Sequence, residues 1–144
     1  MTRAARLMTG LILIVLPTVE YGGQFLLRSL GDKSSHYMDN PLREDLFRAG
    51  HAHAGVIMLL ALVGQVLADH AALPPPLVWL IRLALPLSAM LMSAGFFLSV
   101  APANATHPSG LLTLTYAGGV LLALALLGLA IGLLRSPNSA ANPV

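Results

Sequence analysis

Residues 110–134 read GLLTLTYAGGVLLALALLGLAIGLL, a stretch without a single charged side chain. A helix needs about 20 apolar residues to cross the roughly 30 Å hydrocarbon core of a bilayer, so this stretch is long enough to span one. Three further apolar stretches occupy residues 7–30, 46–67 and 77–100. Inside lipid, every backbone N–H and C=O group needs a hydrogen-bond partner within the protein, which only helices and closed β-barrels provide. These stretches lack the alternation of apolar and polar residues that is typical of β-strands. We therefore expect four transmembrane helices.

The composition also indicates an integral membrane protein. Of the 144 residues, 56% are apolar and 10% are charged, whereas a soluble domain carries about 25% charged residues. The absence of cysteine excludes disulfides, thiolate metal sites and covalently attached haem. A net charge of only +2 argues against nucleic acid as a partner. We expect an all-α membrane protein with one four-helix domain over residues 1–144, arranged as a bundle or an arc.

The connections between the spans carry most of the charge and the turn residues. Asn40 followed by Pro41 predicts a helix start, because Asn is a good N-cap and Pro suits the first helical position. Arg82 stands near the start of the third span, beside Trp79. We expect Arg82 to extend its charged end to the headgroups while Trp79 lies at the interface. The basic residues divide equally between the two sides of the membrane, so they do not set its orientation.

Two polar residues, Glu20 and Gln24, stand one helical turn apart within the first span. An ionisable side chain in the hydrocarbon core is costly and therefore needs a reason. One interpretation is a hydrogen-bonded pair that holds neighbouring helices together. The other is a carboxylate that accepts a proton or orients a ligand.

The second span opens with two histidines, His51 and His53, among small residues. Residues two apart lie about 200° apart on a helix, so these imidazoles cannot bind one metal ion from one helix and must face different neighbours. The small residues around them allow a flat group or another backbone to approach closely. The sequence favours a ligand role. The alternative is two neutral histidines, one of them hydrogen-bonded to Glu20 or Gln24.

A rise of 1.5 Å per residue places several polar side chains at a similar depth in one leaflet. We call these side chains the polar belt, and its members are Gln24, His51, His53, Ser93 and Tyr116. Glu20 does not belong to the belt and lies about one helical turn deeper. The other half of the spans is almost purely aliphatic. The asymmetry predicts a site near one membrane surface rather than a pore through the chain.

Two segments resemble the first two helices of haem–copper oxidase subunit I. The first is Leu26-Leu27-Arg28-Ser29-Leu30-Gly31, and the second is Gly50-His51-Ala52-His53-Ala54-Gly55-Val56-Ile57-Met58. The resemblance covers about residues 17–65. In that family the histidine that opens the second helix is an axial ligand of a low-spin haem, and His53 aligns best with it, with His51 as the alternative.

The resemblance also carries implications for assembly and orientation. Residues 77–100 and 110–134 contain no histidine, so one chain cannot build the family's dioxygen-reducing centre. The family arranges twelve helices as three similar four-helix arcs, which a homotrimer of this chain would imitate. The family's orientation places the N-terminus inside and the histidines toward the outer face.

The leading hypothesis is a homo-oligomeric, preferably trimeric, membrane protein that binds haem b through His53 or His51. Gln24 and Tyr116 would be polar groups near the cofactor, and the role would be electron transfer or small-gas chemistry with an unidentified redox partner. One alternative is a copper or zinc site formed by His53, His51 and Glu20 of neighbouring chains. Further alternatives are a non-catalytic scaffold or accessory subunit, and a small channel or proton-coupled carrier that uses Glu20.

Overall fold

The computed structural model describes residues 1–136, and all regular structure in that range is helical. The long helices are α1 (Arg3–Gly31), α2 (Pro41–Leu67), α3 (Pro75–Ser99) and α4 (Thr113–Leu134), with short 3₁₀ helices at η1 (Lys33–Ser35) and η2 (Gly110–Leu112). Each long helix, with η2 counted as part of the fourth, is long and apolar enough to cross a membrane. The prediction of an all-α, four-span membrane protein is confirmed to this extent. Residues 137–144, which the predicted single domain includes, lie outside the described part of the chain.

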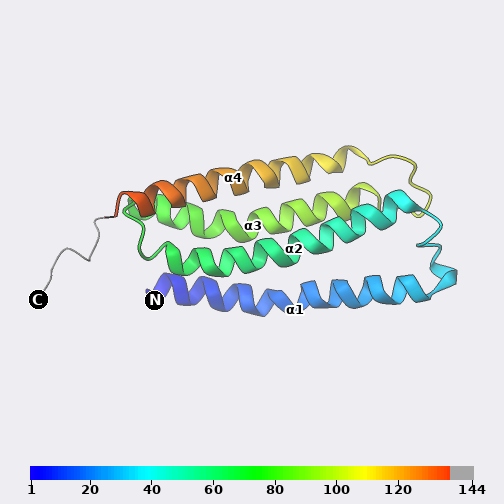
Figure 1. Cartoon of the computed structure of the whole chain (residues 1–144), viewed down its shortest axis with the longest axis horizontal. Coiled ribbons are helices and arrows are strands. Elements are labelled where there is room, and N and C mark those ends of the chain that lie inside the picture. Colours follow the sequence, from blue (N-terminus) through cyan, green and yellow to red (C-terminus); the bar gives the residue numbers. More distant parts are fainter. Residues whose placement is uncertain (137–144) are drawn as a thin grey trace, which may run out of the picture.

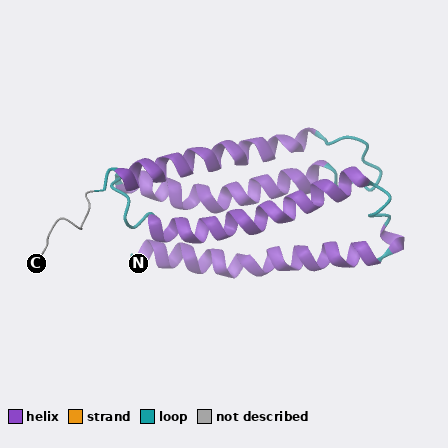
Figure 2. Ribbon diagram, in the orientation of Figure 1, coloured by secondary structure: helices purple, strands orange, loops and turns teal. Residues whose placement is uncertain are grey.

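The helices run alternately up and down and lie side by side in chain order (Figures 1 and 2). Each helix packs mainly on its neighbours in the sequence. Within residues 1–136, α1 and α4 do not contact each other. The chain therefore forms an open arc rather than a closed bundle, and one side of α1 and one side of α4 have no helix packed against them.

The main apolar core is formed mostly by α2, α3 and α4, and Ile12 of α1 also belongs to it. Ala61 and Leu85 are fully buried at its centre. A second core cluster closes the end of the molecule at which α1 ends and α2 begins, and it consists of Leu26, Tyr37, Phe47 and Val100. Glycines allow the close contacts: a Cβ at Gly64 of α2 would lie 2.3 Å from Leu85 Cδ1 of α3, and a Cβ at Gly95 of α3 would lie 2.5 Å from the Thr115 nitrogen of α4. These contacts hold α2 in a fixed position, and α2 carries both histidines.

The start of α2 follows from the residues that cap it. Asn40 is the N-cap, and its side chain accepts a hydrogen bond from the Arg43 amide at 3.2 Å. Its amide nitrogen donates to the carbonyls of Ala103 and Ala105 in the third connection, at 3.0 and 2.9 Å. The predicted helix start at Pro41 is confirmed. Asn40 also joins the first and third connections at one end of the arc.

Candidate functional site

The two histidines of α2 face different neighbouring helices. His51 lies against α1, where a Cβ built on Gly23 would be only 3.1 Å from Cε1 and Nε2 of the imidazole. His53 lies on the side of α3, and its ring centroid is 5.1 Å from that of Phe96. This arrangement agrees with the prediction from their spacing, and it prevents the two rings from binding one metal ion within a single chain.

His51 lies in a groove of about 330 Å³ between α1 and the first turns of α2. The absence of a side chain at Gly23 leaves room for the ring, whereas a Cβ at Gly22 would be in ordinary contact with Nδ1, at 3.6 Å. The groove has mainly aliphatic walls, with one imidazole and one guanidinium; it is lined by Gly23, Leu26, Leu27, Leu30, Tyr37, Arg48 and His51. It is therefore an apolar groove with a cationic group at one end.

His53 is fixed in one tautomer by its own helix. Its Nδ1 is 2.7 Å from the carbonyl oxygen of Ala49, one turn earlier. A carbonyl oxygen can only accept a hydrogen bond, so Nδ1 carries the proton and the neutral ring has its lone pair on Nε2. Among residues 1–136, no hydrogen bond reaches Nε2. The same arrangement, with one ring nitrogen donating to a carbonyl and the other free, orients most histidines that ligate metals.

Gln24 lies on the outward face of α1, whereas Glu20 lies at the side of α1 that borders α2, and neither side chain contacts a histidine within the described residues. At about 100° per residue they are roughly 120° and 160° around the helix from the buried Leu26, and both side chains are exposed. Neither forms a hydrogen bond to a histidine, or to the other, within the described residues. Glu20 lines a second apolar groove of about 360 Å³ with Pro17 and Gly55. The predicted Glu20–Gln24 pair and the predicted bond to a histidine are therefore not formed within one chain.

The polar belt lies at one level, although its members point in different directions. His51 meets Gly23 across α1 and α2, and the Ser93 hydroxyl donates to the Gly50 carbonyl across α2 and α3 at 2.9 Å. On α4, Thr115 Oγ1 donates to the Met92 carbonyl of α3 at 3.1 Å. Tyr116, the next residue, is 67% exposed and faces away from α3.

The described residues do not form a metal centre within one chain. No group of three or more His, Asp and Glu side chains there lies close enough to hold a metal ion. The proposed set of His53, His51 and Glu20 is spread over three faces of two helices. A site that used all three would need residues from a neighbouring chain.

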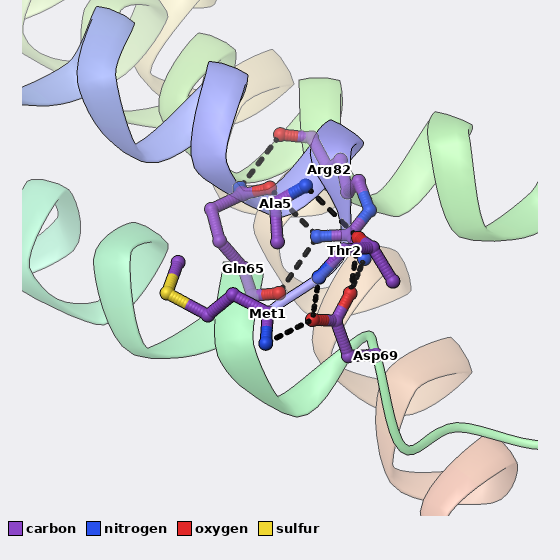
Figure 3. Close-up of polar contacts among 6 residues, drawn as sticks. All are labelled: Met1, Thr2, Ala5, Gln65, Asp69 and Arg82. Carbon is purple, nitrogen blue, oxygen red and sulfur yellow. Dashed lines mark hydrogen bonds and ion pairs between the residues drawn. The ribbon is translucent and has the colours of Figure 1, made fainter.

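A second polar cluster, at the opposite end of the arc, was missed in part by the sequence reasoning (Figure 3). Arg82 is only 2% exposed, and its guanidinium donates to the Gln65 carbonyl at 2.7 Å and to Asp69 Oδ1 at 2.5 Å. The Gln65 side chain donates back to the Arg82 carbonyl at 3.1 Å. The Arg82 side chain, which was expected to reach the headgroups, is instead buried against Gln65 and Asp69. Gln65 and Arg82 add two buried polar side chains to the half of the spans that was expected to be almost purely aliphatic.

Asp69 extends this cluster to the start of α1. Oδ2 and Oδ1 accept hydrogen bonds from the amide and the hydroxyl of Thr2, at 2.8 and 2.6 Å (Figure 3). Burial raises the pKa of Asp69, but the hydrogen bonds from Thr2 and Arg82 outweigh it and lower the pKa to about 2. The cluster joins three helices and has its hydrogen bonds satisfied, so its role is structural. The sequence did carry a signal for this cluster: Gln65 and Asp69 stand one helical turn apart at the end of the second span, and Arg82 is the one charged residue of the third span.

No protein-family model, curated protein or solved structure matches this chain. The function must therefore be argued from the residues and their geometry.

Proposed function

We propose that the protein is an integral membrane haem-binding protein in which His53 ligates the iron through Nε2. The single observation that carries the proposal is the 2.7 Å hydrogen bond from His53 Nδ1 to the Ala49 carbonyl. It leaves Nε2 as the free lone pair and holds the ring in one orientation, as a ligating histidine requires. The resemblance of residues 17–65 to haem–copper oxidase subunit I implies the same histidine.

The residues around His53 fit a non-covalently bound haem. The chain has no cysteine to attach the group, and an imidazole nitrogen is a common axial ligand of haem b. Phe96 packs against the His53 ring and restricts its rotation. The residues on either side of His53, Ala52 and Ala54, are small, as the close approach of a flat group to the helix requires.

Each residue has a separate part in this proposal. A bound haem supplies one-electron transfer and, where an axial position is open, binding of a small gas such as oxygen or nitric oxide. His53 holds the iron, the Ala49 carbonyl sets its tautomer, and the apolar helices exclude water. His51 faces the opposite way and supplies at most the ligand of a second site. Gln24 and Tyr116 lie at the same level but face outward, so they would approach the cofactor only from a neighbouring copy.

The proposal is tested by absorption spectroscopy of the purified full-length protein, as isolated and after addition of haem. We expect a Soret band that His53→Ala abolishes, and that His51→Ala and the matched loop variant His70→Ala retain. Addition of free imidazole to His53→Gly should restore the band, which separates loss of the ligand from loss of the fold. A folded protein with no Soret band after haem addition, or a His53→Ala variant with full haem content, would overturn the proposal.

Elemental analysis of the same sample separates haem from the alternatives. Iron in proportion to haem supports the proposal. Stoichiometric copper or zinc without haem would favour the metal site of His53, His51 and Glu20 from neighbouring chains. Protein that contains neither, and in which the histidine variants lose only stability, would favour a scaffold in which His53 serves to pack α2 against Phe96.

A further inference from the structure

A polar stripe on α1 is not covered by any other helix within residues 1–136, and Glu20 forms its edge beside the groove shared with Gly55 of α2. Glu20, Tyr21 and Gln24 are all exposed, and Tyr21 is 69% exposed. On the helix they lie roughly 120–160° from the buried Leu26, which packs toward α2. Ionisable and polar side chains within membrane spans almost always face protein or a water-filled cavity, because lipid offers them no hydrogen bonds. The stripe therefore indicates a protein surface rather than a lipid surface.

The outer face of α4 presents two hydroxyl groups near its start: that of Thr113, which donates to the Gly110 carbonyl at 2.8 Å, and that of Tyr116. Its neighbours Thr115 and Gly118 are buried against α3, whereas Tyr116 is 67% exposed. The rest of this face is aliphatic and includes Val120 and Leu127, which are each 61% exposed. The two free sides of the arc are thus a polar stripe on α1 and an apolar face with one phenol on α4.

Gln24 on α1 and Tyr116 on α4 lie at the same depth in the membrane, as three contacts between successive helices show. Gly23, which precedes Gln24, meets His51; Gly50, which precedes His51, accepts the hydrogen bond of Ser93. On the far side, Met92 accepts the hydrogen bond of Thr115, which precedes Tyr116. Gln24 and Tyr116 are therefore level with each other on opposite edges of one molecule.

We propose that α1 of one copy of this chain docks against α4 of the next, head to tail, with Tyr116 hydrogen-bonded to the stripe of Glu20 and Gln24. A phenol donates to a carboxylate and also accepts from an amide, so it matches both groups chemically. Because the two surfaces are on opposite edges of an open arc, repeated contacts of this kind can close into a ring. The interface also gives the Glu20 carboxylate a partner within the membrane. It does not depend on whether the protein binds haem.

Paired cysteines test this interface in native membranes, since the chain has no cysteine of its own. We expect the double variant Gln24→Cys, Tyr116→Cys to form a ladder of covalent oligomers on mild oxidation, whose last member gives the number of copies in the ring. Gln24→Cys and Tyr116→Cys, expressed together as separate chains, should give a mixed dimer. The matched control pairs Gln24→Cys with Leu127→Cys, which lies on the same face of α4 but roughly 16 Å deeper, and should not cross-link.

Several results would overturn the proposal. If Gln24→Cys alone cross-links efficiently, α1 meets α1 of another copy and the contact is not head to tail. If Gln24→Cys cross-links only to a different protein, the stripe serves a partner of another kind. If the ladder is absent while the protein remains folded, the two surfaces do not meet.

A second measurement tests the proposed hydrogen bonds themselves. In lipid vesicles, Tyr116→Phe and Glu20→Gln should each weaken self-association by about three- to tenfold, the range of single interhelical hydrogen bonds in membranes. The conservative change Val120→Ile on the same face of α4 should leave it unchanged. Unaltered association in both polar variants would remove Tyr116 and the stripe from the interface.

Discussion

At the scale of single residues, the polar side chains of the helices gather near the two ends of the molecule, and their hydrogen bonding differs between these ends. Arg82, Asp69 and Gln65 satisfy one another at one end, and a buried charge is tolerable only when it is paired in this way. At the other end, within residues 1–136, the one hydrogen bond of the His53 side chain is to its own helix, and Nε2 has no partner. The contrast between a satisfied cluster and an imidazole with a free lone pair distinguishes the structural end of the molecule from the candidate site.

The lowered pKa of Asp69 predicts how stability depends on pH. Asp69 follows the end of α2, and hydrogen bonds from Thr2 and Arg82 bring its pKa from the ordinary 3.8 to about 2 despite its burial. Because the pKa is lower in the folded state, the stabilisation is fully present above about pH 4 and is lost as the pH falls toward 2. Unfolding titrations in detergent should show this fall in the wild type and a smaller one in Asp69→Asn. Equal slopes in the two proteins would contradict the prediction.

At the scale of helices, much of the architecture could be predicted, and what could not be predicted depends on side-chain direction. Hydropathy located the spans to within a few residues, and Asn40 located the start of α2. Hydropathy could not show that α1 begins as early as Arg3, because Thr2 caps it there. It also could not show that Glu20 is exposed beside α2 or that Arg82 is buried, since both depend on which faces of neighbouring helices meet.

The α3–α4 contact depends on glycine, which predicts unequal effects of two alanine substitutions. A Cβ at Gly95 would lie 2.5 Å from the backbone nitrogen of Thr115, so the helices must separate. We expect Gly95→Ala to lower the free energy of unfolding by about 1–3 kcal/mol. At Gly119 a Cβ would meet nothing within 4 Å, so Gly119→Ala should be neutral or stabilising by up to about 1 kcal/mol. Equal effects in reversible unfolding would show that α3 and α4 are not in close contact at this point.

At the scale of the whole molecule, the open arc connects the candidate site with the proposed assembly. His53 lies between α2 and α3, inside the arc, whereas Glu20, Gln24 and Tyr116 lie at its two edges. The sequence predicted that His53, Gln24 and Tyr116 share one depth and that Glu20 lies about one turn deeper, because depth follows from position along each helix. It could not predict that they face different directions, because that follows from the order in which the helices pack.

Asn40 holds the arc together at the end nearest the histidines. It caps α2 and also binds the connection between α3 and α4, and two substitutions distinguish these two roles. Asn40→Asp keeps an oxygen that can cap α2 but loses the donors to Ala103 and Ala105. Asn40→Ala loses both the cap, worth about 1 kcal/mol, and the donors. In hydrogen exchange, Asn40→Asp should expose the connection over residues 101–109 while the first turn of α2 stays protected; Asn40→Ala should expose both. If Asn40→Asp leaves that connection as protected as in the wild type, the first and third connections are joined by packing of the second core cluster rather than by this side chain.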